Sequence, residues 1–382
     1  MPEIKLDQPL FKRFYAHLNS AVSIVTDYQG QMPFAYFLKN YFAQHKKFGS
    51  KDRRQIATLC YSFFRLGKSY PGLTVLQKML KGYQLSQLDW GEDWRQFFQQ
   101  FGLPEAPPEA IFAFANPLSD GVGRAAFEAA HLVQPDLFLR LRPEFENAVI
   151  NKLEAAKMDY VRSGATVRLP NSSKIEQVLQ LNKEAVIQDF SSQRVGLLLK
   201  TFADHFQPSR KKVAVWDCCA ASGGKSLLAY DILKDIQLTV SDVRPSILAN
   251  LKKRFAEAGI TGYRSFIADA AEGSIPQCFD LIIADVPCSG SGTWARTPEQ
   301  LTYFDPSMIK TYAALQRRIA ANAVRFLNPR GFLLYITCSV FAEENEAQVN
   351  FLKESGLTLI EQQLLNGYDK KADTMFAALL RA

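Results

Sequence analysis

The chain has 382 residues, of which 47% are hydrophobic, and its formal net charge is +7. This length suggests two or three domains with packed cores. No apolar run approaches the roughly 20 residues that cross a bilayer, and the N-terminus lacks a signal-peptide pattern, so a soluble, cytoplasmic protein without a membrane span is predicted.

The first 70 residues carry most of the charge pattern. They contain eleven Lys and Arg against four acidic residues, so the excess of seven equals that of the whole chain. Phe and Tyr are interleaved with these basic residues, a pattern typical of a surface that contacts nucleic acid. The alternative is a solvated positive face without a partner.

Residues 9–94 show the periodicity of amphipathic helices, and no strand alternation interrupts them. Gly49 to Asp52 form a plausible helix start before one apolar stripe. Prolines and glycines between Pro104 and Gly123 then mark a linker region. We therefore predict an all-α domain over residues 1–125.

A small α/β subdomain is predicted next, over residues 133–200. Residues 136–142 form a strand candidate, a helix follows over 146–156, and further strands are expected near Thr166 and Ala185.

From Val213 onwards the pattern alternates strictly between strands and helices. Strands are predicted at 213–217, 238–242, 264–268, 279–285 and 331–338. This alternation indicates a mostly parallel sheet with right-handed crossovers, so residues 201–382 are expected to form a Rossmann-like α/β domain.

Two cysteines lie at the ends of predicted strands, Cys288 three residues after the strand 279–285 and Cys338 as the last residue of the strand 331–338. The carboxyl edge of an open α/β sheet is where its chemistry is placed, so both sulfurs are candidate nucleophiles. The alternative is a pair of buried, unreactive thiols. Cys60, Cys218 and Cys278 are interpreted as structural or incidental, and no close cysteine pairing indicates a metal site.

The turn after the first strand of this domain leads through small residues into a helix. Gly223 and Gly224 allow close approach of a ligand, although tight packing of the turn explains them nearly as well. A dinucleotide-binding fold is the competing prediction, but Gly-x-Gly-x-x-Gly is absent. Asp242 ends the next strand at the position of an acid that binds ribose hydroxyls, and Asp269 is placed to meet an adenine edge.

Three motifs together resemble the RsmB/Nol/Sun family of RNA (cytosine-5) methyltransferases. They are Cys219-Ala-Ala-Ser-Gly-Gly-Lys225, Asp285-Val-Pro-Cys-Ser-Gly-Ser-Gly292, and Thr337-Cys-Ser339 with Glu344-Asn-Glu346. The resemblance implies a Rossmann-like methyltransferase domain that uses S-adenosylmethionine. The cofactor-binding residues are then expected to be Cys219, Ala220, Ala221, Ser222, Gly223, Gly224, Lys225, Asp242, Asp269 and Asp285.

The resemblance extends to the other parts of the chain. Residues 49–65 look like the NusB-type helical domain of bacterial RsmB proteins. The subdomain that ends at residues 188–193 resembles the family's RNA-recognition-like insert.

Methylation of cytosine at carbon 5 requires a nucleophile that adds to carbon 6, and a thiolate supplies it. The ring also needs a proton or hydrogen bond at position 3, for which Asp285 has the right chemistry. The RNA family places its nucleophile in Thr-Cys, which favours Cys338, and uses the Pro-Cys sulfur, here Cys288, to release product. Cytosine-5 DNA methyltransferases instead attack with the Pro-Cys sulfur.

The leading hypothesis is a monomeric enzyme acting on ribosomal RNA. The alternatives are transfer RNA as substrate and a non-catalytic RNA-binding assembly factor. Trp294 and Arg296 are candidates for holding a displaced base, or for capping the next helix. Ser222 stands where the family has Pro and Ala295 where it commonly has Arg, so substrate detail transfers less well.

Overall fold

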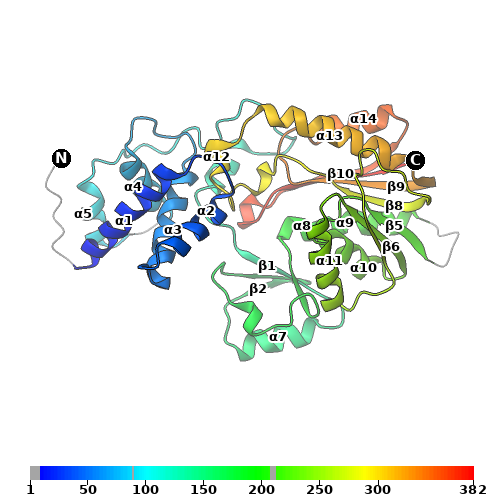
Figure 1. The fold of residues 1–382 in the computed structure, drawn as a ribbon, viewed down its shortest axis with the longest axis horizontal. Coiled ribbons are helices and arrows are strands. Elements are labelled where there is room, and N and C mark those ends of the chain that lie inside the picture. Colours follow the sequence, from blue (N-terminus) through cyan, green and yellow to red (C-terminus); the bar gives the residue numbers. More distant parts are fainter. Residues whose placement is uncertain (1–8, 88–89, 207–211) are drawn as a thin grey trace. The chain divides into compact units, whose positions relative to one another are not determined.

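The computed structural model describes the whole chain except residues 1–8, 88–89 and 207–211 (Figure 1). The chain divides into two compact units. One contains the residues up to 115 together with 123–134 and 294–306, and the other contains 116–122, 135–293 and 307–382. Within the described residues, no helix combines the length and apolar character needed to cross a membrane.

The first unit is helical. Its described elements are α1 (Pro9–Asp27), α2 (Phe34–Gln44), α3 (Ser50–Arg65), α4 (Val75–Leu85), α5 (Glu92–Gln99), α6 (Arg124–Ala130) and α12 (Gln300–Tyr303). The predicted helix start at Gly49 is confirmed, because the Asp52 carboxylate accepts the Gly49 N–H at 3.1 Å.

Several of the phenylalanines between the basic residues lie in the interior of the helical unit. Phe11, Phe14, Phe34 and Phe64 are all buried in the core of the helical unit. Arg65 is also buried, and its Nη1 donates to the carbonyls of residues 131, 133 and 295. The prediction that aromatic residues contact nucleic acid is therefore wrong for these four side chains, because they pack in the hydrophobic core instead.

Exposed lysines and arginines nevertheless remain on the helical unit: Lys12, Arg13, Lys39, Lys46, Lys47, Lys51 and Arg54. They leave the basic character of its surface intact.

The second unit contains a small antiparallel sheet with the strand order β2-β3-β1-β4. Its elements are β1 (Leu137–Leu141), α7 (Glu146–Ala155), β2 (Val161–Ser163), β3 (Thr166–Leu169) and β4 (Ala185–Ile187). The predicted strands and the predicted helix are confirmed. The strand β2 was missed because all three of its residues are exposed and give no alternation to read.

The second unit also contains a seven-stranded sheet with the order β10-β11-β9-β8-β5-β6-β7. The strands β5 (Val213–Asp217), β6 (Ile236–Asp242), β7 (Arg264–Ile267), β8 (Phe279–Asp285) and β9 (Leu327–Thr337) are parallel. This confirms the predicted Rossmann-like architecture. The strands β10 (Thr358–Leu365) and β11 (Met375–Arg381) are antiparallel additions that were not predicted.

Helices cover both faces of this sheet (Figure 1). The helices α9 (Gly196–His205), α10 (Gly224–Leu233) and α11 (Pro245–Glu257) pack on one face, and α13 (Ser307–Val324) and α14 (Glu346–Glu354) on the other. Successive residues of β8 alternate between the two cores, Leu281 and Ile283 in one and Ile282 and Ala284 in the other. This two-sided burial explains the unbroken apolar runs of the sequence.

Candidate active site

A cavity of about 370 Å³ opens at the carboxyl ends of the parallel strands. The strand β5 lies there between β6 and β8, so the chain order reverses at this point and leaves a crevice. The cavity brings together seven of the predicted site residues: Cys219, Ala221, Asp242, Asp269, Asp285, Cys288 and Cys338. Ala220, Ser222, Gly223, Gly224 and Lys225 do not line it.

The turn between β5 and α10 has the backbone shape that its glycines predict. Gly223 adopts a positive φ of 81° as the residue before α10. A Cβ atom at Gly223 would also lie only 2.6 Å from the Phe255 ring, so both conformation and packing require glycine. Ser222 Oγ accepts a hydrogen bond at 3.3 Å from Arg254 Nη1.

The Asp242 carboxylate is held in place at the end of β6. It accepts hydrogen bonds from the backbone N–H of Ala221 at 3.0 Å and from Arg244 Nε at 2.9 Å and Nη2 at 3.0 Å. Burial raises the pKa of Asp242, but the hydrogen bonds from Arg244 outweigh this effect and bring the pKa below its ordinary value. Asp242 is therefore an ionised acceptor facing the cavity.

Asp269 also lines the cavity and is exposed. One of its oxygens accepts the backbone N–H of Ala271 at 2.8 Å, which fixes the side chain against its own turn.

The two predicted nucleophiles lie against each other. Cys288 Sγ is 3.4 Å from Cys338 Sγ. The hydrogen bond with Cys338, burial, and the negative charges of Cys338 and Glu344 together raise the pKa of the Cys288 thiol well above its ordinary value. Ionisation of one thiol of the pair therefore disfavours ionisation of the other.

A buried carboxylate, which the sequence analysis left without a role, joins the two cysteine loops. Glu344 is fully buried and accepts the Ser289 N–H at 2.8 Å, the Ser289 hydroxyl at 2.5 Å and the Ser339 hydroxyl at 2.5 Å. Gln316 Nε2 also donates to it at 3.1 Å. Glu344 thus connects the residues that follow each cysteine. The only sequence signal was its place in the Glu344-Asn-Glu346 motif.

Lys225 extends from α10 to Asp285. Its Nζ lies 3.1 Å from Asp285 Oδ2 and 2.9 Å from Ser192 Oγ. Lys225 is buried, whereas Asp285 is partly exposed and lines the cavity. Ser192 was not among the predicted site residues, because nothing local to residues 188–193 indicates which side chain they face.

The structure overturns one base-binding candidate. Trp294 is only 1% exposed and packs against Phe112, Phe114 and Phe304, with ring centroids 4.8–5.5 Å apart. Its indole belongs to the core of the helical unit, so the prediction that Trp294 holds a displaced base is wrong.

Comparisons with known proteins find relatives of this chain among RNA methyltransferases. The model of the family described as 16S rRNA methyltransferase RsmB/F matches residues 204–378. The ribosomal RNA small subunit methyltransferase B of Xylella fastidiosa (strain 9a5c) is 29% identical over 237 residues, 60% of this chain and 54% of that protein.

A second relative is the ribosomal RNA small subunit methyltransferase F of Shigella flexneri serotype 5b (strain 8401). It is 32% identical over 157 residues, 40% of this chain and 32% of the relative. The matched segments thus span about half of the first relative and about a third of the second.

The fold is also found among solved structures. The crystal structure of PH0851 superposes with a TM-score of 0.68 over 99% of this chain and 100% of its own, at 18% identity. At this identity the likeness shows the fold alone.

Proposed function

We propose that this chain, whose residues 204–378 match the RsmB/F family of 16S rRNA methyltransferases, methylates carbon 5 of a cytosine in ribosomal RNA. The observation that carries the proposal is the pair of thiols 3.4 Å apart in a cavity that also holds Asp285 and Asp242. One thiol is needed to activate the ring and a second group to complete the reaction.

The cavity fits S-adenosylmethionine, which supplies an electrophilic methyl group when bound. Its volume lies within the range of small-molecule sites. In this proposal Asp242 accepts hydrogen bonds from the ribose hydroxyls and Asp269 meets the adenine edge. Cys219 and Ala221, which line the cavity, would meet the methionine part, and Ala220, Ser222, Gly223, Gly224 and Lys225 complete the loop that carries them.

Cys338 is the proposed nucleophile. Its thiolate adds to carbon 6 of cytosine, which makes carbon 5 nucleophilic toward the methyl group. The two sulfurs lie within hydrogen-bond distance of each other, so one can lose its proton while the other keeps it, and the resemblance to the RNA family favours Cys338 as the sulfur that attacks. Once carbon 5 carries the methyl group, a base removes the carbon 5 proton and the Cys338 sulfur leaves. Cys288 assists this last step.

Asp285 is the proposed proton partner of the cytosine ring at position 3. It lies three residues before Cys288 and lines the same cavity. Lys225 lies within hydrogen-bond distance of Asp285 and orients its carboxylate at the cavity.

Ribosomal RNA is favoured because both relatives are named for the small ribosomal subunit. The helical domain (residues 1–125) and the RNA-recognition-like subdomain (133–200) would contact RNA, and 201–382 would carry the chemistry. We expect a monomer acting in the cytoplasm. Transfer RNA remains the alternative substrate, and an assembly factor without catalysis the alternative class.

The test is methyl transfer by the purified chain from labelled S-adenosylmethionine to ribosomal RNA, small-subunit particles and transfer RNA. Nucleoside mass spectrometry then identifies the product. We expect 5-methylcytosine in ribosomal RNA, in free form or within the particle. A Cys278→Ala variant should behave as wild type, because this exposed cysteine does not line the cavity. RNA binding without methylation would instead favour the assembly factor.

A further inference from the structure

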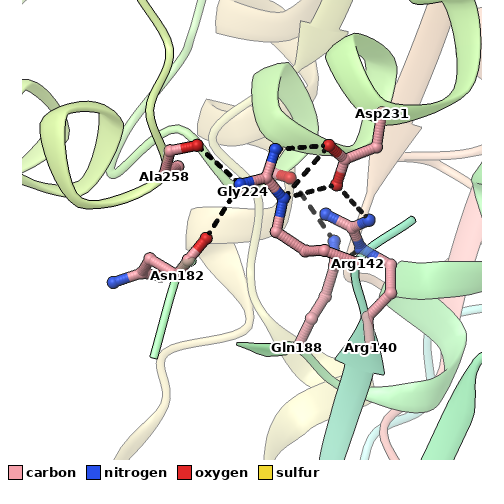
Figure 2. A network of polar contacts seen from close by, with 7 residues as sticks. All are labelled: Arg140, Arg142, Asn182, Gln188, Gly224, Asp231 and Ala258. Atoms are coloured by element: carbon pink, nitrogen blue, oxygen red, sulfur yellow. Dashed lines mark hydrogen bonds and ion pairs between the residues drawn. The ribbon is translucent and has the colours of Figure 1, made fainter. Parts of the chain in front are cut away.

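A buried charge cluster joins the small antiparallel sheet to α10, one of the helices that pack on the seven-stranded sheet (Figure 2). Arg140 of β1 and the following Arg142 both pair with Asp231 of α10. Arg140 Nη1 lies 2.6 Å from Asp231 Oδ2, and Arg142 Nη2 lies 2.7 Å from Oδ1. All three residues are buried, so the pairs are shielded from solvent and fix β1 firmly against α10.

A chain of hydrogen bonds leads from this cluster toward the cavity. Arg140 Nε donates to Gln188 Oε1 at 2.8 Å, and Gln188 Nε2 donates to Ser192 Oγ at 3.2 Å. Figure 2 shows that Gln188 also reaches the carbonyl of Gly224, at the start of α10. Arg140 thereby fixes which way the Gln188 amide points, since its oxygen must face the guanidinium.

This series of hydrogen bonds ends at Lys225. Ser192 Oγ accepts a hydrogen bond from Lys225 Nζ at 2.9 Å, and Lys225 Nζ also contacts Asp285 at 3.1 Å. A lysine side chain has a flexible four-carbon stem, so a fixed ammonium position requires partners that oppose its rotational freedom. Ser192 supplies one such partner and Asp285 the other.

We propose that Ser192 is a positioning residue, oriented by Gln188 and Arg140, that holds the Lys225 ammonium against Asp285. The proposal rests on the proposed function, in which Asp285 is the proton partner of cytosine. Ser192 acts only through Lys225, so it should govern the rate of the bound complex rather than the affinity for RNA.

Ser191, the residue directly before Ser192, provides a matched control. Ser191 is fully buried, and its hydroxyl has no hydrogen-bond partner among the described residues. Ser191→Ala therefore makes the same chemical change without touching Lys225.

The experiment measures kcat and KM for RNA at saturating S-adenosylmethionine, with thermal unfolding of each variant. We expect Ser192→Ala to lower kcat about tenfold, because it removes a hydrogen bond to a charged group, while KM stays within about twofold. Ser191→Ala should retain the wild-type kcat. Ser192→Thr, which keeps the hydroxyl, should recover most of the loss.

Several results would overturn the proposal. These are equal kcat for Ser192→Ala and Ser191→Ala, a rise in KM without loss of kcat, or a folded Ser192→Thr variant as slow as Ser192→Ala. Wild type without methylation on any RNA would instead be a failure of the proposed function. The two failures are therefore distinguishable.

Discussion

The sulfur atoms of Cys288 and Cys338 lie 3.4 Å apart although 50 residues separate them in the chain. The cause is the parallel pairing of β8 with β9, in which Asp285 is the register partner of Ile336. Each thiol follows this aligned pair by two or three residues, so both arrive at the same point of the sheet edge. The sequence alone does not show that the two cysteines are in contact, because their contact depends on this register.

The cofactor assignment predicts opposite roles for two paired residues. Asp242→Ala removes the proposed acceptor for the ribose hydroxyls and should weaken binding of S-adenosylmethionine by about tenfold or more. Arg244 covers the same carboxylate in the free protein and competes with the ribose for it. Arg244→Ala should therefore bind the cofactor as well as or better than wild type. Isothermal titration measures both, and weaker binding by Arg244→Ala alone would refute the assignment.

Glu344→Gln should disturb both cysteine loops. The amide places an NH₂ group where hydroxyls now donate to a carboxylate, which should cost about 1–3 kcal/mol of stability. The substitution also removes the negative charge of Glu344. This charge raises the pKa of Cys288, although less than Cys338 and burial do.

Alkylation of Cys288 by iodoacetamide should therefore become faster in Glu344→Gln, and peptide mass spectrometry can follow it. Glu343→Gln is the matched control, because the neighbouring side chain is not fully buried. Unchanged stability and alkylation in Glu344→Gln would show that Glu344 does not join the loops.

Asp217 should make stability depend on pH. Burial, helped by the charge of Asp285, raises its pKa from 3.8 to about 7, although the Ser226 hydroxyl donates to it at 2.5 Å. Between these values the folded state binds more protons than the unfolded state, so this group destabilises the fold as pH rises. The unfolding temperature of wild type relative to Asp217→Asn should therefore fall from pH 4 to pH 7. A constant difference between the two proteins would contradict the raised pKa.

The buried charge cluster predicts a large loss of stability. Asp231→Ala leaves two buried guanidinium groups without their shared carboxylate, which should cost about 3–5 kcal/mol. Asp204→Ala, an exposed change on α9, should stay within about 0.5 kcal/mol of wild type. Urea denaturation compares the two variants, and equal losses would mean that the cluster contributes little.

The parallel strands could be predicted from sequence because burial on both faces gives them unbroken apolar runs. The strand β10 could not, since residues 358–365 mix polar and apolar side chains without strand alternation. The strand β11 was missed although residues 375–380 are apolar and buried, because a short apolar run alone does not distinguish a strand from a buried helix segment. Their conformation depends on long-range pairing, of β11 with β9 and of β10 with β11.

The residues of the candidate site also fall into two groups, those that could be predicted from sequence and those that could not. Cys288, Cys338, Asp242 and Asp285 follow strand ends and could be found along the chain. Long-range contacts alone reveal Ser192 beside Lys225 and Glu344 between the cysteine loops. The same limit explains Trp294, whose burial depends on aromatic residues far from it in sequence.

The most direct test of the account compares wild type, Cys338→Ala and Cys288→Ala with RNA and labelled S-adenosylmethionine, followed by denaturing gels for methylated RNA and protein–RNA adducts. We expect Cys338→Ala to lose both signals and Cys288→Ala to accumulate an adduct that it cannot release. An adduct that persists in Cys338→Ala and is absent from Cys288→Ala would contradict it, because the nucleophile would then be Cys288.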